Sequence, residues 1–450
     1  MRNGANVLNE PQMKNLKLLY WLSAFLLITD YVMPQYFGID IGYDLTCTRI
    51  ANLGILLYFF LNPRLFTHFC KTMFSCRLFI FFVIYLFVCG YTMVLRVDLN
   101  AFFMVFFEVL TLFMLVYCIR YVLGVERAIR WGINSAYFLG VLGIVDYVLG
   151  QSLMLKFLKT VPTSVANTYR SGQYRIMGPC GHPLAYGLYL ILLIPLACID
   201  FKKNEVYLFK RPVLILLLML NVFLTGSRST LGIVILEVFL IIIFSNKKNV
   251  KKTFFFLLTL IVGMSFFLLL FYETKIGQYV LMQLASLIDQ FFGTEYAAYF
   301  GAEVTRLDDS EEYRKMLPLI FTLDWLNPLV GRGVSRSFGA EINGFYIISI
   351  DNYYVSQYIK YAYPGLITYV MIIVSTVTGM IVAIKKYKSP VFKMTFVGTV
   401  CYFINLWWLD ALQTLKYEYI IIAIFYALYM YYEDNGNSRK NHDLAYVKEM

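Results

Sequence analysis

The chain has 450 residues, of which 60% are hydrophobic and only 15% are charged, and its mean hydropathy is +0.65. Soluble domains carry about 25% charged residues, so this composition excludes an ordinary soluble protein. The net charge of +11 requires no nucleic acid as a partner, because basic loops beside anionic lipid headgroups account for it. Apolar runs of about 17–25 residues recur, each long enough to cross a bilayer core of about 30 Å. We therefore predict an all-α, multi-spanning membrane protein with one transmembrane domain over residues 1–450.

Twelve membrane-spanning helices are predicted along the chain. We expect them at residues 16–33, 45–61, 77–95, 101–121, 131–149, 183–199, 212–226, 229–245, 253–271, 364–384, 391–409 and 417–432. The first run follows two lysines but lacks a small-residue cleavage site, which favours an uncleaved span over a signal peptide. An even number of spans places both termini on the same side of the membrane, with residues 433–450 as a polar tail there.

Basic residues predict which side that is. They cluster at residues 64–77, 120–130, 202–211, 247–252, 385–393 and 439–448, all on the side of the termini, whereas the short opposite loops hold only Arg96, Arg228 and Lys416. The positive-inside rule therefore predicts cytoplasmic termini. Two loops on the outer side are long, at residues 150–183 and 272–364, and long loops in compact proteins usually carry function. The first begins with SLMLKFLKT, which is typical of a short helix lying in the membrane interface.

Arg228 stands in LTGSRSTLG, a turn with very few polar residues between two predicted spans. Its planar guanidinium suits phosphate, and the neighbouring serines and glycine supply further donors. The alternative is a snorkelling arginine beside a serine that caps the next helix. An arginine in a minimal outer turn runs against the positive-inside trend, which favours a functional role.

The first long loop carries Arg170 and Arg175. They are interpreted either as a pyrophosphate clamp or as solvated loop charges. Arg175 is the stronger candidate, because the chain passes from it directly into the apolar span that starts at Pro183. His182 is a candidate base, although a lone histidine before a proline is more often a turn residue at the membrane surface.

The second long loop ends in a stretch rich in charged and aromatic side chains. Arg332 and Arg336 lie four residues apart among glycines, where they gather anionic oxygens or are simply solvated. Asp351 precedes a helix-like run, so it is either the N-cap of that helix or a general base.

Asn352 follows as a candidate substrate contact. In the same run, Tyr354 and Tyr358 stack on sugar rings or belong to an interfacial aromatic belt.

Four ionisable residues fall within predicted spans, namely Arg49, Glu108, Asp146 and Glu237. Such residues usually face a cavity or pair with one another. Arg49 and Asp146 are both near the outer ends of their spans and are expected to line one cavity. Glu108 and Glu237 keep a proton-coupled transporter open as an alternative. The acidic cluster at residues 308–312 lacks histidine or a spaced carboxylate partner, so we predict no metal and no cofactor.

Three motifs together carry a resemblance to a known family. RIMGPCGHPLAYG leads into a span, LTGSRSTLG separates two spans, and NPLVGRGVSRSFG is followed by DNYYVSQYIKYAYPG. In order and sidedness they resemble the O-antigen polymerase and O-antigen ligase family, which is similar in architecture to C-type glycosyltransferases. The resemblance implies metal-independent transfer of sugars from lipid pyrophosphates at the outer face of the bacterial cytoplasmic membrane. It also implies that Arg175, Arg228, Arg332 and Arg336 handle the pyrophosphate.

Asp351 stands where the ligase branch has a histidine, which favours the polymerase branch and leaves the general base open. The function expected is a polymerase that joins undecaprenyl-pyrophosphate-linked repeat units, with fixed arginines stabilising the departing pyrophosphate. An O-antigen ligase and a lipid-linked oligosaccharide flippase remain the alternatives. Expected partners are the lipid-linked oligosaccharides and membrane lipids, with a chain-length regulator and a flippase as candidates.

Overall fold

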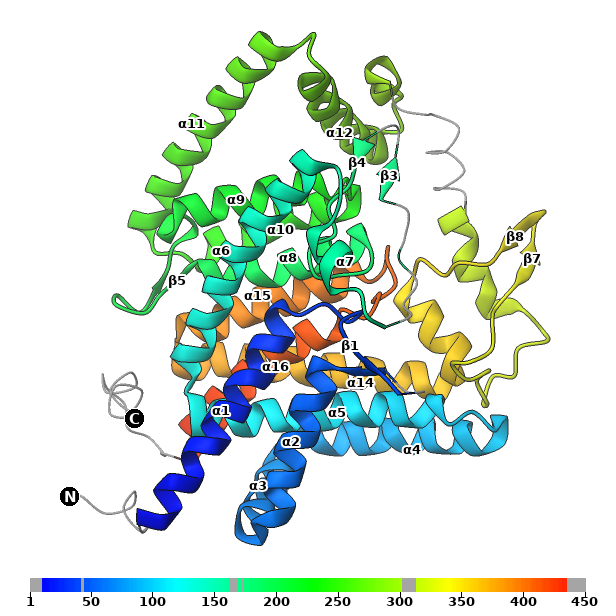
Figure 1. Ribbon diagram of the computed structural model, residues 1–450. Coiled ribbons are helices and arrows are strands. Elements are labelled where there is room, and N and C mark those ends of the chain that lie inside the picture. The colour runs from blue at the N-terminus through cyan, green and yellow to red at the C-terminus, as the bar shows by residue number, and fades with distance from the viewer. Residues whose placement is uncertain are drawn as a thin grey trace.

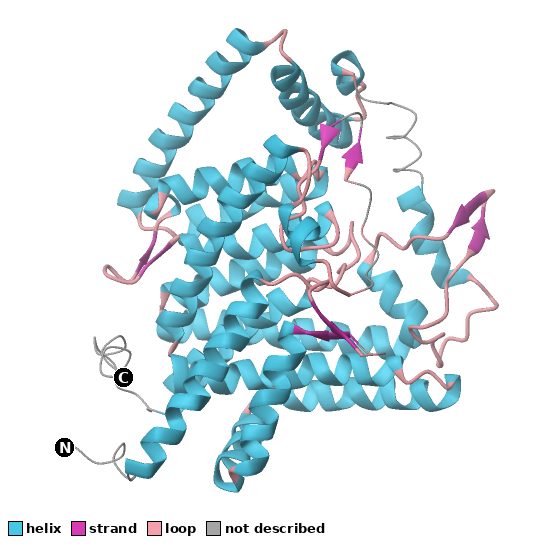
Figure 2. Ribbon diagram, in the orientation of Figure 1, coloured by secondary structure: helices cyan, strands magenta, loops and turns pink. Residues whose placement is uncertain are grey.

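The computed structural model describes residues 10–41, 44–161, 165, 168–170, 173–301 and 313–434. Over these residues the protein is a bundle of α-helices, with only short two-stranded hairpins in its loops (Figures 1 and 2). The helices are α1 (Glu10–Val32), α2 (Cys47–Leu61), α3 (Pro63–Ser75), α4 (Leu78–Arg96), α5 (Asn100–Cys118), α6 (Val125–Leu149), α7 (Leu153–Leu158), α8 (Pro183–Ala197), α9 (Pro212–Leu224), α10 (Arg228–Phe244), α11 (Lys247–Phe271), α12 (Lys275–Phe292), α14 (Tyr353–Tyr387), α15 (Pro390–Asn405) and α16 (Leu415–Asp434).

The strands pair as antiparallel hairpins. They are β1 (Gly38–Asp40) with β2 (Asp44–Thr46), β3 (Tyr169–Arg170) with β4 (Gln173–Tyr174), β5 (Ile199–Asp200) with β6 (Glu205–Val206), and β7 (Ala340–Ile342) with β8 (Phe345–Ile347). One turn of π-helix (Ile119–Leu123) continues α5, and 3₁₀ turns occur at Leu208–Lys210, Tyr296–Phe300 and Leu317–Thr322.

Each predicted span falls on one helix, namely α1, α2, α4 to α6, α8 to α11, and α14 to α16. By length and apolarity, five of the described helices are able to cross a membrane, or six if the bent pair α2–α3 counts as one span. The pair bends by 116° after Leu61, and α3 was expected to be a loop. Pro63 explains it, because proline at the first helical position is compatible with starting a helix but not with continuing one.

Burial separates the central helices from the peripheral ones. Nearly every side chain of α8 is buried, and α15 and α16 pack against it in the middle of the bundle. A helix that is apolar all round belongs in such a position. By contrast, no residue in the apolar window of α11 is buried, and this helix stands apart from the bundle in Figure 1. Its apolar surface is suited to contact with lipid rather than water.

The connections at one end of the bundle meet each other, and we call this end the loop end. The amide of Val161 donates to the carbonyl of Tyr36 (3.2 Å), and the amide of Tyr353 donates to that of Leu406 (3.0 Å). The first long loop does contain the expected short helix, α7. The second contains α12 and the β7–β8 hairpin, neither of which was predicted.

Helix α14 is interrupted near its beginning, and the break is filled by a loop. Ala362 has φ +56°, and Pro364 has no amide hydrogen for the carbonyl of Lys360. That carbonyl accepts instead from the amide of Gly333 (3.1 Å), and the carbonyl of Ile359 accepts from the backbone amide of Arg332 (2.8 Å). The loop at residues 328–333 therefore satisfies the carbonyls that the break leaves open.

Candidate functional site

Arg175 and Arg228 come together at the α9–α10 turn, although 52 positions separate them. Arg175 is buried, and its Nε donates to the carbonyl of Thr225 (2.7 Å). Gly226 has φ +61°, and a Cβ there would lie 3.1 Å from the Arg175 Nε, so a glycine lets the turn close over the guanidinium. Arg228 is half-buried as the first residue of α10. The hydroxyl of Ser227 caps this helix by accepting from the amide of Thr230 (3.3 Å).

His182, at the start of α8, lies near Arg175. Its Nδ1 accepts from the amide of Leu184 (3.0 Å), so the ring caps the helix. Burial, together with the positive charge of Arg175, lowers the pKa of His182 to about 4, while the negative charge of Asp351 opposes the shift. The imidazole is therefore neutral at pH 7, and the cap occupies the lone pair of its Nδ1. The cap explains why a histidine precedes Pro183.

Asp351 does not cap α14; this alternative was wrong by one residue. The N-cap is Asn352, whose Oδ1 accepts from the amide of Val355 (3.1 Å) and whose Nδ2 donates to the carbonyl of Trp407 (2.8 Å). Asn352 is buried, whereas the carboxylate of Asp351 is half-buried and accepts from Ser349 Oγ (3.2 Å). The structure thus assigns the structural role to Asn352.

Two further charged residues belong to this region, Asp410 and Lys360, and the sequence analysis missed both. The charges of Asp351 and Lys360 both act on Asp410. Asp410, in the α15–α16 connection, accepts at Oδ1 from the amide of Ala411 (2.8 Å). Burial raises the pKa of Asp410; the charge of Lys360 opposes this, and the charge of Asp351 adds to it. The signal was present, since Asp410 is a lone acid where a predicted outer span ends. We call Arg175, His182, Asp351, Lys360 and Asp410 the junction site.

Arg332 and Arg336 are held at a different turn, the one between α4 and α5. The guanidinium of Arg332 stacks over Trp325 at 5.1 Å and donates to the carbonyl of Ser337 (3.2 Å). Arg336 is exposed and donates to the carbonyl of Arg96 (3.3 Å). The amide of Arg332 donates to the carbonyl of Ile359 (2.8 Å), about two turns into α14. The four arginines therefore form two pairs on separate turns.

The tyrosines of α14 are largely engaged in packing. Tyr358 is buried, with its ring centroid 4.7 Å from those of Phe321 and Tyr363. The hydroxyl of Tyr354 donates to the carbonyl of Phe403 (2.8 Å). Sugar stacking by either ring stays a prediction, and these contacts account for both residues without it. Arg170 lies in β3, where only its backbone is described.

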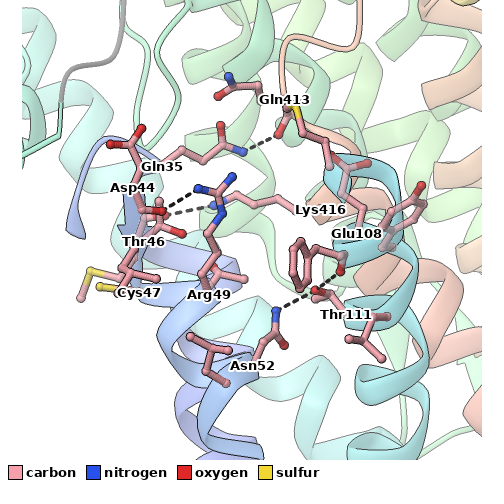
Figure 3. Close-up of a pocket in the computed structure, with 18 of the residues that line it drawn as sticks. Gln35, Asp44, Thr46, Cys47, Arg49, Asn52, Glu108, Thr111, Gln413 and Lys416 are labelled. Atoms are coloured by element: carbon pink, nitrogen blue, oxygen red, sulfur yellow. Dashed lines mark hydrogen bonds between the residues drawn. The ribbon is translucent and has the colours of Figure 1, made fainter. Parts of the chain in front are cut away.

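Arg49 lines a separate cavity of about 240 Å³, bordered by α2, α5 and the start of α16 (Figure 3). Its Nη1 donates to the carbonyl of Asp44 (2.6 Å). Asp146, expected in the same cavity, does not line it. Its Oδ1 accepts instead from the amide of Leu153 (3.0 Å) at the start of α7. The expectation of a shared cavity was therefore wrong.

The residues that the structure describes contain no group of three or more His, Cys, Asp or Glu able to hold a metal ion. The acidic cluster at residues 308–312 lies outside the described residues. No protein-family model matches the chain, and a comparison with curated proteins finds no match either. What the junction site offers chemically is a buried guanidinium, an ammonium group and two carboxylates at the loop end of an apolar bundle. Such a set is able to bind an anion and to accept a proton.

Proposed function

We propose that this chain is a polysaccharide polymerase of the bacterial cytoplasmic membrane. It joins undecaprenyl-pyrophosphate-linked oligosaccharide repeat units at the outer face and uses no metal. The observation that carries the proposal is the junction site. Three distant segments bring Arg175, Asp351, Lys360 and Asp410 to one end of an apolar bundle, and charges in such surroundings usually serve function.

The reaction assigns a role to each group. A hydroxyl oxygen of the acceptor sugar attacks the anomeric carbon of the donor, and the bond from that carbon to the pyrophosphate oxygen breaks. Arg175 and Arg228 stabilise the negative charge that develops on the leaving pyrophosphate. Asp351 accepts the hydroxyl proton, because the Nδ1 of His182 is already engaged in capping α8. Each contribution is typically worth about 10²–10⁴-fold in rate.

Asp351→Asn and Arg175→Gln test these roles in a strain that lacks the chromosomal gene. Both variants, at normal protein levels, should replace the ladder of long glycans with single repeat units on a gel. Arg64→Gln is the matched control, since Arg64 is exposed on α3 and belongs to neither site. Normal ladders from Asp351→Asn would remove the proposed base.

The predicted topology belongs to the same proposal. Twelve crossings would place the loop end outside the cytoplasm and both termini inside, as the distribution of basic residues favours. Alkaline phosphatase fused after residue 346, in the β7–β8 hairpin, should be active, whereas fusion after residue 387 should be inactive. The reverse pattern would put the junction site on the cytoplasmic face, where external polymerisation does not occur.

A flippase or proton-coupled transporter is the second candidate, and Glu237 favours it. This residue of α10 is fully buried, and among the described residues neither of its carboxylate oxygens has a hydrogen-bond partner. If Glu237→Gln stranded repeat units on the cytoplasmic face while Asp351→Asn left polymer length unchanged, transport would replace polymerisation as the function. A ligase differs only in its acceptor, and the attachment of polymer to lipid A core would reveal it.

A further inference from the structure

The cavity around Arg49 is separate from the junction site and has a mixed lining. Its walls come from the α1–α2 connection, α2, α5 and the first turn of α16 (Figure 3). The polar side chains include Arg49, Lys416, Glu108, Asn52 and Gln413, and most other lining residues are apolar. Such a combination of an apolar wall with a few convergent polar groups is typical of a ligand site.

One part of the lining holds two cations, with Asp44 beside them. Arg49 lies in the first turn of α2, and Lys416 lies in the first turn of α16, where its Nζ donates to the carbonyl of Met33 (3.1 Å). The cavity also borders the start of α2, whose amides carry a partial positive charge. Two cations from different helices beside a helix N-terminus are suited to the oxygens of a phosphate.

The opposite part is acidic and amidic. Glu108 projects from α5, where the charges of Arg49 and Lys360 act on it. Asn52 donates to Thr111 Oγ1 (2.7 Å), and Gln35 donates to the carbonyl of Gln413 (2.6 Å). Carboxyl and amide groups donate to and accept from sugar hydroxyls, whereas the two cations suit a phosphate. The lining therefore fits a ligand that carries both a phosphate and hydroxyl groups.

The cavity opens sideways. Leu53, Met104 and Phe107 line it, yet they are 49%, 41% and 39% exposed on the outer surfaces of α2 and α5. In a membrane protein, that surface meets lipid rather than water. Drug-sized ligands occupy pockets of about 300–1,000 Å³, so 240 Å³ holds a headgroup and not a whole oligosaccharide.

We propose that this cavity binds the phosphate and the adjoining sugar of a lipid-linked saccharide, which enters between α2 and α5 with its chain outside. Arg49 and Lys416 hold the phosphate, and Glu108 with the neighbouring amides holds the sugar. The sugar part rests on the proposed function. The phosphate part does not, because an ordinary anionic phospholipid presents the same group to the same cations.

Retention of undecaprenyl phosphate by the full-length protein in phosphatidylcholine nanodiscs tests the proposal, with native mass spectrometry as the readout. Arg49→Gln and Lys416→Gln should each weaken retention about tenfold, and Arg64→Gln should leave it unchanged. Leu53→Trp, which narrows the opening without touching a charge, should weaken it too. Equal retention by the wild type and by properly folded Arg49→Gln would overturn the proposal.

Competition separates the sources of the phosphate. Undecaprenyl phosphate glucose should bind more tightly than undecaprenyl phosphate and displace it. In Glu108→Gln, the two lipids should bind equally well. Equal displacement by phosphatidylglycerol would overturn the sugar part, and equal displacement by inorganic pyrophosphate would overturn access from the lipid side. Retention that depends on Arg49 in a protein without sugar transfer would leave the cavity standing while the polymerase proposal falls.

Discussion

Asp98 anchors the loop that fills the break in α14, and its removal should release this loop. The Oδ2 of Asp98 accepts from the amides of Val334 (2.6 Å) and Ser335 (2.9 Å), and its Oδ1 accepts from Ser335 Oγ (2.7 Å). Hydrogen bonds to charged groups contribute about 1.5–3 kcal/mol each, and neighbouring ones are not additive. Asp98→Ala should therefore destabilise the docked loop by about 3–5 kcal/mol.

Hydrogen exchange provides the assay. In Asp98→Ala, the amides of residues 332–335 should exchange at least a hundredfold faster, while those of the central helix α8 should stay protected. Gly333→Ala is a matched second variant, because Gly333 has φ +85° and a Cβ there would collide with the Asp98 carboxylate. Unchanged exchange in both variants would refute the anchoring role.

The same anchor should respond to pH. Burial raises the pKa of Asp98, but hydrogen bonds from Ser335, Val334 and Asn100 outweigh it and leave the pKa below the ordinary value of 3.8. A carboxylate with a lowered pKa contributes stability above its unfolded pKa and loses it as the pH falls through the folded pKa. Loop protection should therefore be full above pH 3.8 and decline only in stronger acid.

Three further outcomes are expected. Gly331→Val should prevent docking of the loop, because a Cβ there would collide with the carbonyl of Lys360; trypsin should then cleave this loop first. Asn352→Ala should lower stability by about 1–2 kcal/mol through the lost cap, whereas Asn352→Ser should recover part of it in thermal unfolding. For His182, whose pKa falls to about 4, stability should decline from pH 6.5 toward pH 4, and His182→Gln should remove this decline of about 2–3 kcal/mol.

The sequence predicted the helices well because apolar runs of this length leave few alternatives in a membrane. Helix α3 was not predicted, because it is too polar for a membrane span and its start is set by Pro63. The cap of α14 was misplaced by one position because aspartate and asparagine are equally good caps. Asp410 and Lys360 were missed for a different reason. A lone charge at the end of a span marks a candidate position, but its partners are decided only when distant segments pack together.

Lys360 joins the features described so far into one arrangement. Its carbonyl accepts a hydrogen bond from the amide of Gly333 in the docked loop. The charge of its side chain acts on Asp410 in the junction site and on Glu108 in the cavity. Because Pro364 breaks α14 four residues later, the position of Lys360 depends on the loop as well as on the helix. Loss of the Asp98 anchor should therefore weaken lipid retention at the cavity and polymer length together. By contrast, Arg49→Gln should weaken lipid retention at the cavity while leaving the junction site intact. A release of the loop that left both activities unchanged would show that the break in α14 serves packing alone.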